Sequence, residues 1–410
     1  MTGRTETVQS AAAGSGKLWD VLIVGAGPAG ATAAAYLASF GHTVLLLDRH
    51  RFPREKVCGD GLIPDALMSL RALGLYEIVR RQGHCIDNIL VLSPSGIRVQ
   101  IRAQCVTLKR RRLDKLILDE AVARGAAFRT ASVERVRQAA DGSVYADATG
   151  SDIHIRARIG ILATGADVAL LEDLRMLGRR GHSGIAARCY VRSPVKIEEL
   201  VVSFDRSIAP GYAWIFPLGG DEYNVGCGVF FNERRGRKVN LRDAFNTFAS
   251  KVTIARALLD RAKSIGPLRG ARIRSGLAGS SFHNDASILS IGEAVGATYP
   301  FTGEGIGKAM QTGSLAALQV HSALVKSSLE PLSQFQSLVH EHLMPRYFGY
   351  EVAQRWISKP WMSDLIAARI RSSINLQRMA AGIINEATDP RDVFTWRTLL
   401  PQWTRRSNAT

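Results

Sequence analysis

The chain has 410 residues, of which 46% are hydrophobic and 22% charged, so it can bury a core larger than that of one typical domain. This composition is typical of a globular protein and excludes a disordered chain. The five cysteines are scattered without a CxxC pair, which excludes a zinc site or disulfide framework of the usual spacing and favours reduced thiols in the cytoplasm. Apolar runs fall short of the roughly 20 residues of a membrane span, so we expect a soluble or peripheral protein.

The formal net charge of +17 indicates that acidic partners are attracted. Candidates are the anionic cytoplasmic face of a membrane, a phosphorylated substrate and an acidic redox protein. A generic solvated basic surface is an equally good interpretation. We expect no nucleic-acid partner, because no finger, recognition-helix or ribonucleoprotein pattern accompanies the charge.

In chain order, residues 1–17 are small and polar and are expected to form a flexible tail. Residues 19–24 read as a buried strand, residues 28–40 as a helix of small residues, and HTVLLLD as a second buried strand that ends at Asp48. This βαβ order predicts a parallel sheet.

The rest of the chain alternates between strands and helices. Residues 88–104 alternate in polarity around a Ser-Pro-Ser-Gly turn, which predicts an antiparallel hairpin outside the first sheet. A helix is predicted near residues 113–124, a strand at 153–163, and short strands from 181 to 231. A buried strand at 286–291, a helix at 306–325 and a helical C-terminal region follow.

These elements predict an α/β fold with a discontinuous Rossmann-type domain, interleaved with an antiparallel substrate-binding sheet and closed by C-terminal helices. The predicted parts are the tail at 1–17, a nucleotide-binding domain at 18–87, 109–168 and 283–325, a substrate-binding domain at 88–108 and 169–282, and a helical region at 326–410.

A dinucleotide-binding fingerprint directly follows the first predicted strand: Gly25-Ala26-Gly27-Pro28-Ala29-Gly30. Gly25 permits the tight turn, Gly27 lets the backbone approach a pyrophosphate, and Gly30 lets helix and strand pack closely. The helix N-terminus stabilises the phosphate charge. Asp48 follows about twenty residues later, where its carboxylate can accept ribose hydroxyls.

Two features favour FAD over a nicotinamide cofactor. The segment Gly292-Glu293-Ala294-Val295-Gly296 resembles the GDA motif of FAD proteins, whose carboxylate binds the ribityl chain. The sequence also has no second GxGxxG for a separate nicotinamide domain. An external reductant, NADPH or reduced ferredoxin, would then have to reduce the flavin.

Three further segments accompany the fingerprint in a fixed order. They are Pro53-Arg54-Glu55-Lys56-Val57-Cys58-Gly59-Asp60-Gly61, Tyr212-Ala213-Trp214-Ile215-Phe216-Pro217 and Pro300-Phe301-Thr302-Gly303-Glu304-Gly305-Ile306. With these four motifs, the chain resembles the geranylgeranyl reductase family of flavoproteins, which includes digeranylgeranylglycerophospholipid and menaquinone side-chain reductases. The resemblance spans almost the whole chain after the tail and implies a fold like that of p-hydroxybenzoate hydroxylase.

The resemblance also implies the positions of the cofactor and the substrate. It places the second motif beside the isoalloxazine, the third on the wall of a prenyl cavity and the fourth near the pyrimidine end of the flavin. Arg110 heads an R-x-x-L-D pattern similar to the family's phosphate-side arginine. The implied FAD contacts are Ala29, Asp48, Cys58, Gly59, Gly61, Arg110, Val136, Glu293, Gly305 and Ile306. One departure is Glu293, which replaces the usual aspartate and is one methylene longer.

Reduction of an isolated prenyl double bond needs assisted protonation, because such a bond accepts hydride poorly. Aromatic faces stabilise a nearby cation, which gives Tyr212 and Trp214 a catalytic role beside the alternative of ordinary core aromatics. Cys58 can donate a proton or tune the flavin, or it can simply be buried. We expect no metal, since His340 and His342 do not share a helix face.

Two other functions remain open. Flavin monooxygenases and halogenases share this fold, but halogenases carry a WxWxIP motif, in which Tyr212 and Phe216 are substitutions. A non-catalytic, membrane-associated flavoprotein subunit is also compatible with the basic, tryptophan-containing C-terminal part: Trp356, Trp361, Trp396 and Trp403. The favoured hypothesis is an FAD-dependent reductase of carbon–carbon double bonds in an isoprenoid lipid or quinone.

Overall fold

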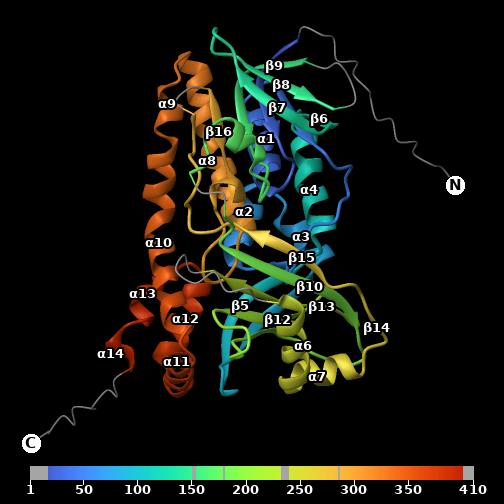
Figure 1. Cartoon of the computed structure of the whole chain (residues 1–410), viewed down its shortest axis with the longest axis vertical. Coiled ribbons are helices and arrows are strands. Elements are labelled where there is room, and N and C mark those ends of the chain that lie inside the picture. The colour runs from blue at the N-terminus through green and yellow to red at the C-terminus, as the bar shows by residue number, and fades with distance from the viewer. Residues whose placement is uncertain (1–16, 150–153, 179–180, 232–239, 285–286, 400–410) are drawn as a thin grey trace, which may run out of the picture.

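A computed structural model describes residues 17–149, 154–178, 181–231, 240–284 and 287–399. The proposed tail, apart from Lys17, and Trp403 lie outside these residues. Two β-sheets lie one above the other in Figure 1, with long C-terminal helices along one side. This arrangement confirms the predicted α/β class.

The first sheet is built on the predicted βαβ unit. Its strands are β1 (Leu18–Val24), β2 (Val44–Asp48), β6 (Ala127–Thr130), β7 (Val133–Gln138), β8 (Val144–Ala148), β9 (His154–Leu162) and β16 (Ile288–Ser290). β1 lies between β2 and β9 and is parallel to both, β6 and β16 extend the parallel part, and β8 and β7 are antiparallel additions. Parallel strands are buried on both faces, which explains the continuous apolar runs of β1 and β2.

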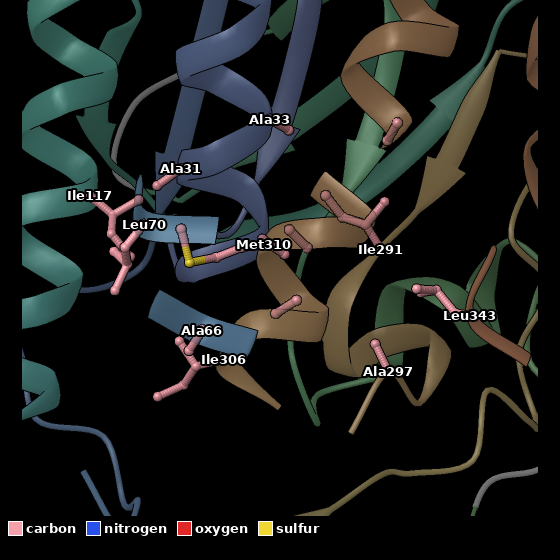
Figure 2. Packing of buried hydrophobic residues seen from close by; sticks show 14 of the residues in the cluster. Ala31, Ala33, Ala66, Leu70, Ile117, Ile291, Ala297, Ile306, Met310 and Leu343 are labelled. Atoms are coloured by element: carbon pink, nitrogen blue, oxygen red, sulfur yellow. The ribbon is translucent and has the colours of Figure 1, made fainter. Parts of the chain in front are cut away.

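Helices lie on and beside this sheet, and the helix that follows β1 consists mainly of small residues. The helices are α1 (Pro28–Ser39), α2 (Pro64–Ala72), α3 (Tyr76–Gln82), α4 (Arg110–Ala123), α5 (Ala169–Asp173), the 3₁₀ helix η1 (Gly292–Val295) and α8 (Ile306–Lys326). A Cβ atom at Gly313 of α8 would lie 2.4 Å from the carbonyl oxygen of Ala29, so α8 contacts the backbone of α1 directly. Figure 2 shows Leu70 and Ile117 beside Ala31 in the same core.

The second sheet contains the predicted hairpin. Its strands are β3 (Gly61–Leu62), β4 (His84–Leu92), β5 (Arg98–Thr107), β10 (Gly184–Arg192), β11 (Leu200–Ser203), β12 (Gly211–Pro217), β13 (Glu222–Phe230), β14 (Ser264–Ile265) and β15 (Arg269–Ile273). β4 and β5 pair antiparallel, and β10, β13 and β12 form an antiparallel series. β11 joins the two parts, since it is antiparallel to β12 but parallel to β4.

Two helices that we did not predict cover one face of the second sheet: α6 (Leu241–Lys251) and α7 (Thr253–Asp260). Their apolar side chains, including Phe245, Phe248 and Leu258, pack with Ile215 and Val225 of the sheet. The spacing of Ala244, Phe245 and Phe248 is that of an amphipathic helix, so the signal was present in the sequence.

The C-terminal region is helical, and part of it packs against the hairpin of β4 and β5. Its helices are α9 (Glu330–Ser333), α10 (Phe335–Ile357), α11 (Pro360–Ser372), α12 (Ile374–Ile384), α13 (Pro390–Val393) and α14 (Trp396–Leu399). α10 packs against α8, while α11 and α12 pack against β5. Within the described ranges, no helix combines the length and the apolar character needed to cross a bilayer.

Candidate active site

A cavity of about 650 Å³ extends from the first sheet to the C-terminal helices. At one end it is lined by Gly25, Asp48 and Ala163, which follow or end the parallel strands β1, β2 and β9. Ligands of open α/β sheets bind at these carboxyl ends. The cavity therefore begins where a dinucleotide is expected.

The three fingerprint glycines have the predicted geometric roles. Gly25 has a φ of +103°, and a Cβ atom there would lie 2.3 Å from the carbonyl oxygen of Ala163. A Cβ atom at Gly30 would lie 1.9 Å from the carbonyl oxygen of Gly25, so Gly30 serves helix packing and does not line the cavity. At Gly27 an added Cβ would contact only the Arg54 guanidinium, at 3.5 Å. The chain thus leaves room for a ligand at Gly27.

The N-terminus of α1 offers free donors at this place. No side chain caps the helix at Gly27, and both Gly27 and Ala29 line the cavity. The first N–H groups of a helix have no partner within the helix and attract anions. Arg54, which we did not single out from the sequence, lines the same region, and its buried Nε lacks a hydrogen-bond partner. These donors fit the diphosphate of FAD.

Asp48 and Arg110 both line the cavity, but each also has a partner within the protein. The Asp48 Oδ2 accepts a hydrogen bond from the Ala26 N–H at 2.9 Å. The Arg110 guanidinium donates to both carboxylate oxygens of Asp114, at 2.6 and 2.9 Å. Asp114 is therefore the residue of the R-x-x-L-D pattern that holds the arginine in place.

The structure places the Val136 side chain away from the cavity. Val136 is 4% exposed and packs in the hydrophobic cluster that contains Leu22, Val144 and Ala146. The residue of β7 that lines the cavity is Val133. The side chain of Val136 is therefore a core residue, on the same strand as one that lines the cavity.

Glu293 lies on the cavity wall in η1. Its Oε1 accepts a hydrogen bond from the Arg274 N–H at 3.3 Å, and its Oε2 lies 3.9 Å from the Lys56 Nζ. A Cβ atom at Gly292 would lie 2.8 Å from that of Ala29, which sets η1 against the start of α1. The carboxylate is partly exposed and can accept further hydrogen bonds from a ligand.

The other motifs meet in the middle of the cavity. Cβ atoms at Gly59 and Gly61 would lie 3.1 and 3.2 Å from the Phe216 ring, and one at Gly303 would lie 3.0 Å from the Tyr212 hydroxyl. Trp214 lies between the other two aromatic rings, with centroids 5.9 Å from Tyr212 and 6.2 Å from Phe216. The second, third and fourth motifs thus form one wall.

The fourth motif also supplies Gly305 and Ile306, which both line the cavity. A Cβ atom at Gly305 would lie 2.6 Å from the Thr298 hydroxyl, so a side chain there would displace Thr298. Ile306 begins α8. The loop therefore runs directly along the cavity before the helix starts.

Asp60, the aspartate of the C-G-D-G loop, is a site residue that we did not predict. It is fully buried with a φ of 63°, and its carboxylate accepts hydrogen bonds from the Arg110 N–H, the Tyr190 hydroxyl and the Asn224 amide, at 3.0, 2.8 and 2.8 Å. Burial raises the pKa of Asp60, while the hydrogen bonds from Tyr190 and Asn224 oppose that rise. Asp60 therefore fixes the loop to both α4 and the second sheet.

Asn224 continues this connection to two predicted catalytic residues. Its amide also donates to the carbonyl oxygen of Cys58 at 2.8 Å, and its Oδ1 accepts from the Trp214 Nε1 at 2.9 Å. The sequence signal that could have identified Asn224 is its polar side chain within the buried strand β13. Asn224 holds Trp214 and the Cys58 loop in a fixed relation.

Cys58 and Tyr212 are both neutral in this environment. Burial raises the pKa of the Cys58 thiol, although the Arg110 cation opposes the rise. Burial likewise raises the pKa of Tyr212, whose hydroxyl donates to the carbonyl oxygen of Thr302. Since its hydroxyl has a partner, Tyr212 offers the cavity mainly its ring.

Beyond the aromatic wall the cavity is lined by aliphatic side chains. They come from the second sheet and from α11, α12 and α13: Ile89, Val91, Val99, Ile101, Leu200, Val202, Ile366, Ile370, Ala380, Ile383, Ile384 and Val393. This end can hold a long apolar group, whereas the other end can hold a charged dinucleotide.

The geometry agrees with the comparisons with known proteins. The family model described as FAD binding domain matches residues 19–324. A menaquinone reductase of Mycolicibacterium smegmatis is 32% identical over 412 residues, which cover 92% of this chain and 95% of that protein. The chain therefore belongs to the geranylgeranyl reductase family of FAD-dependent oxidoreductases. As a member of this family, it is a flavoenzyme.

One further relative and one solved structure are also similar to this chain. Digeranylgeranylglycerophospholipid reductase 2 of Methanosphaera stadtmanae is 27% identical over 363 residues, which cover 82% of this chain and 87% of that protein. The crystal structure of a geranylgeranyl bacteriochlorophyll reductase-like protein from Thermoplasma acidophilum has a TM-score of 0.75 at 19% identity, covering 92% of this chain and 99% of that one. At this identity the likeness shows the fold alone.

Replacement of Glu293 tests the position of the flavin. Glu293→Ala is expected to weaken FAD binding by about 1.5–3 kcal/mol, the contribution of hydrogen bonds to a charged group. Glu293→Asp should retain the flavin. The measurement is titration of the apoprotein with FAD, with Glu341→Ala on the exposed face of α10 as the matched control. An unchanged affinity in Glu293→Ala would contradict the proposed ribityl contact.

Proposed function

We propose that this protein reduces carbon–carbon double bonds in an isoprenoid chain carried by a lipid or a quinone. The observation that carries the proposal is the continuity of the cavity, which joins a dinucleotide site to an aliphatic compartment past an aromatic wall. The names of the relatives point to substrates of this class. A small polar substrate would not fill the aliphatic end of the cavity.

The aliphatic compartment suits a prenyl chain in shape and chemistry. It is enclosed by branched side chains such as Ile101 on β5, Ile370 on α11 and Ile383 on α12. Burial of each methylene group of a ligand contributes about 0.8 kcal/mol. The same side chains exclude water from the reacting bond, which strengthens every electrostatic interaction around it.

The aromatic wall stabilises positive charge at the reacting carbon. Trp214 is 6% exposed, and its indole nitrogen is occupied by Asn224, so its ring is what it can present to a ligand. A Cβ atom at Gly226 would lie 2.4 Å from the Trp214 ring, which fixes the ring against β13. A desolvated aromatic face over a cation contributes about 2 kcal/mol. Tyr212 extends this surface.

A reduced flavin bound at the nucleotide end supplies a hydride from N5. The protein holds the alkene beside it through the aliphatic compartment and the aromatic wall. Cys58 lies on the wall between Arg110 and Tyr212, where its neutral thiol can tune the flavin ring.

A flavin-dependent halogenase or monooxygenase is the alternative. A flavin-dependent brominase has a TM-score of 0.72 at 17% identity, covering 92% of this chain and 97% of that one, which shows the shared fold alone. In the W-x-W-x-I-P motif of halogenases, this chain keeps the second Trp as Trp214 but has Tyr212 for the first Trp and Phe216 for the Ile. The reductase is therefore the better proposal.

The function is tested with the flavin reduced by dithionite without oxygen. Supplied with prenyl lipids, prenyl diphosphates and menaquinones, the enzyme should give products heavier by two hydrogens for each bond reduced, because hydride and proton add across the double bond. Mass spectrometry measures the products. NADPH and reduced ferredoxin then replace dithionite in turn to identify the external reductant.

The contradicting outcome comes from a parallel reaction. There the enzyme receives oxygen, halide and an aromatic acceptor. Hydroxylated or halogenated product in that reaction, together with unchanged prenyl lipids in the first, would overturn the reductase proposal.

Cys58→Ala tests the role of the thiol at the wall. The variant should retain FAD but slow alkene reduction by about tenfold or more, which corresponds to about 1.4 kcal/mol of barrier. Flavin content and single-turnover rates are measured together. Cys85→Ala on β4, an exposed cysteine, is the matched control and should keep the wild-type rate. A full rate in Cys58→Ala would assign Cys58 to packing.

We further propose that the helices around the aliphatic end contact an anionic membrane. Trp361 and Trp396 are 58% and 63% exposed, and Ile374 is 61% exposed, on α11, α14 and α12. α11 packs against α12 and α14. Other side chains of α11 line the cavity. Together with the net charge of +17, this surface favours anionic lipid headgroups beside the substrate compartment.

Sedimentation with vesicles tests this contact. Binding to vesicles with anionic lipids should exceed binding to neutral ones and should decrease with salt, because the attraction is screened. Trp361→Ala should weaken binding, whereas Ile265→Ala, an equally exposed apolar residue on β14, should not. Binding that depends neither on lipid charge nor on Trp361 would exclude this surface as the membrane contact.

A further inference from the structure

Two carboxyl groups, that of the fully buried Asp65 and that of the partly exposed Glu304, lie beside the start of α8. Asp65, at the start of α2, is 0% exposed, and its Oδ1 accepts hydrogen bonds from the Lys308 ammonium and the Gln311 amide at 2.9 and 2.6 Å. The Glu304 Oε1 accepts a hydrogen bond from the Gly307 N–H at 2.7 Å. In Figure 2, Ala66 near the start of α2 lies next to Ile306 at the start of α8, so the beginnings of these two helices are adjacent.

Each of these carboxyl groups has one buried oxygen without a donor. They are the Oδ2 of Asp65 and the Oε2 of Glu304. Asp65 raises the pKa of Glu304 both through its charge and as a hydrogen-bonding neighbour, but two ionised carboxylates have no proton to share. A single proton between them satisfies both oxygens at once. Buried polar atoms are rarely left unpaired, so the protonated pair is the stable form.

The charges of the surrounding network require the same proton. Ion pairs connect Lys308 to Asp65 and Glu386, and Glu386 to Arg346, at 2.9, 3.4 and 3.0 Å. With Glu304 included, three carboxyl groups lie near two cations. The side chains that form these ion pairs are at most 16% exposed. Neutralising one carboxyl group balances the charge and avoids burying an unpaired anion.

Glu304 is the member of the pair that reaches the cavity. It lines the cavity between Gly303 and Gly305, and its charge would act on the nearby Tyr212 of the aromatic wall. Asp65 does not line the cavity and is held by Lys308. The pair therefore has one fixed acceptor in the protein interior and one carboxyl group on the cavity wall.

We propose that Glu304 is the acid that protonates the substrate alkene, and that Asp65 is the positioning residue that keeps Glu304 protonated. This inference rests on the proposed reductase function. The π bond of the alkene breaks, one carbon gains the hydride from the reduced flavin, and the other gains the proton of Glu304 once its O–H has turned from Asp65 toward the cavity. Glu304 becomes a carboxylate that accepts from Gly307, and repulsion by Asp65 favours its reprotonation from solvent.

The environment of Glu304 favours its protonated form. Burial raises the pKa of Glu304 well above its ordinary value, and Asp65 raises it further, while Lys308 lowers it. The other titratable groups that face it, Tyr212 of β12 and Tyr347 of α10, are neutral because burial raises their pKa values. The thiol of Cys58 is a weaker acid than a carboxyl group and therefore a poorer proton donor.

Infrared spectroscopy of the FAD-loaded full chain tests the shared proton without any substrate. At neutral pH, the wild type should show the C=O stretch of a protonated carboxylic acid, which ionised carboxylates lack. Glu304→Gln should remove it while its amide N–H donates to Asp65, which preserves the structure. Asp65→Asn should also remove it, because loss of the neighbouring anion lets Glu304 ionise. Glu341→Gln, on the exposed face of α10, should leave it unchanged.

Reoxidation of the reduced flavin by a prenyl lipid tests the catalytic role. Without oxygen, Glu304→Gln should slow this reaction by about a hundredfold or more, the contribution of a positioned general acid, with FAD affinity unchanged. The wild-type rate should fall as pH rises through the pKa of Glu304, because the donor is then lost. Glu304→Gln should lack this alkaline decrease, whereas Cys58→Ala should retain it.

The possible outcomes separate this inference from the function on which it rests. An acid band that persists in Glu304→Gln, or a Glu304→Gln enzyme that reduces alkenes at the full rate, would overturn the assignment of Glu304. A wild-type enzyme that reduces no alkene overturns the proposed function, and the infrared band then still decides whether Glu304 and Asp65 share a proton. Loss of both the band and the rate in Glu304→Gln supports the proposal.

Discussion

The carboxylate of Asp60 connects α4 to the second sheet, next to Gly59 and Gly61, which line the cavity. It accepts hydrogen bonds from α4 through the Arg110 N–H, from β10 through Tyr190 and from β13 through Asn224. A buried carboxylate with several donors is stable, but the loss of these donors would leave its charge unpaired. The positions of Cys58 and Trp214 depend on this residue, because Asn224 contacts all three.

The cavity combines two environments that are usually separate in proteins. One end has the free N–H groups of α1 and the Arg54 cation, as an anionic dinucleotide requires. The other end is formed by aliphatic side chains of the second sheet and of α11 and α12. The aromatic side chains of β12 separate them, so that a flavin and an apolar chain can meet at a short, water-poor boundary. This layout follows from strand alternation, since Ala213 and Ile215 face the core under α6 while Tyr212 and Trp214 face the cavity.

Charge is distributed unevenly between the surface and the interior. The surface carries the excess of basic residues, whereas the acids Asp65, Glu304 and Glu386 are gathered beside the start of α8. Such a buried group of like charges is costly unless protons or cations compensate it. Its position against the cavity wall is the reason for assigning it to proton transfer rather than to stability.

The sequence by itself determined the nucleotide-binding half of this protein. The βαβ unit and the close approach of Gly30 to Gly25 depend on residues close in sequence, and such local patterns can be read from a single chain. The conformation of Gly25 and the close approach at Gly30 are consequences of these few positions. The α/β class followed from the same pattern.

Only the tertiary structure decided how the site is completed. Asp60 and Asn224 are 164 positions apart, and Lys308 and Asp65 are 243 apart. No local sequence pattern therefore predicts either pair. The side chain of Val136, which the family resemblance implied as an FAD contact, packs in the core, and only the tertiary structure shows this. Side-chain spacing tells which face of a strand or helix is apolar, but burial and hydrogen bonding between distant segments select the partner that covers it.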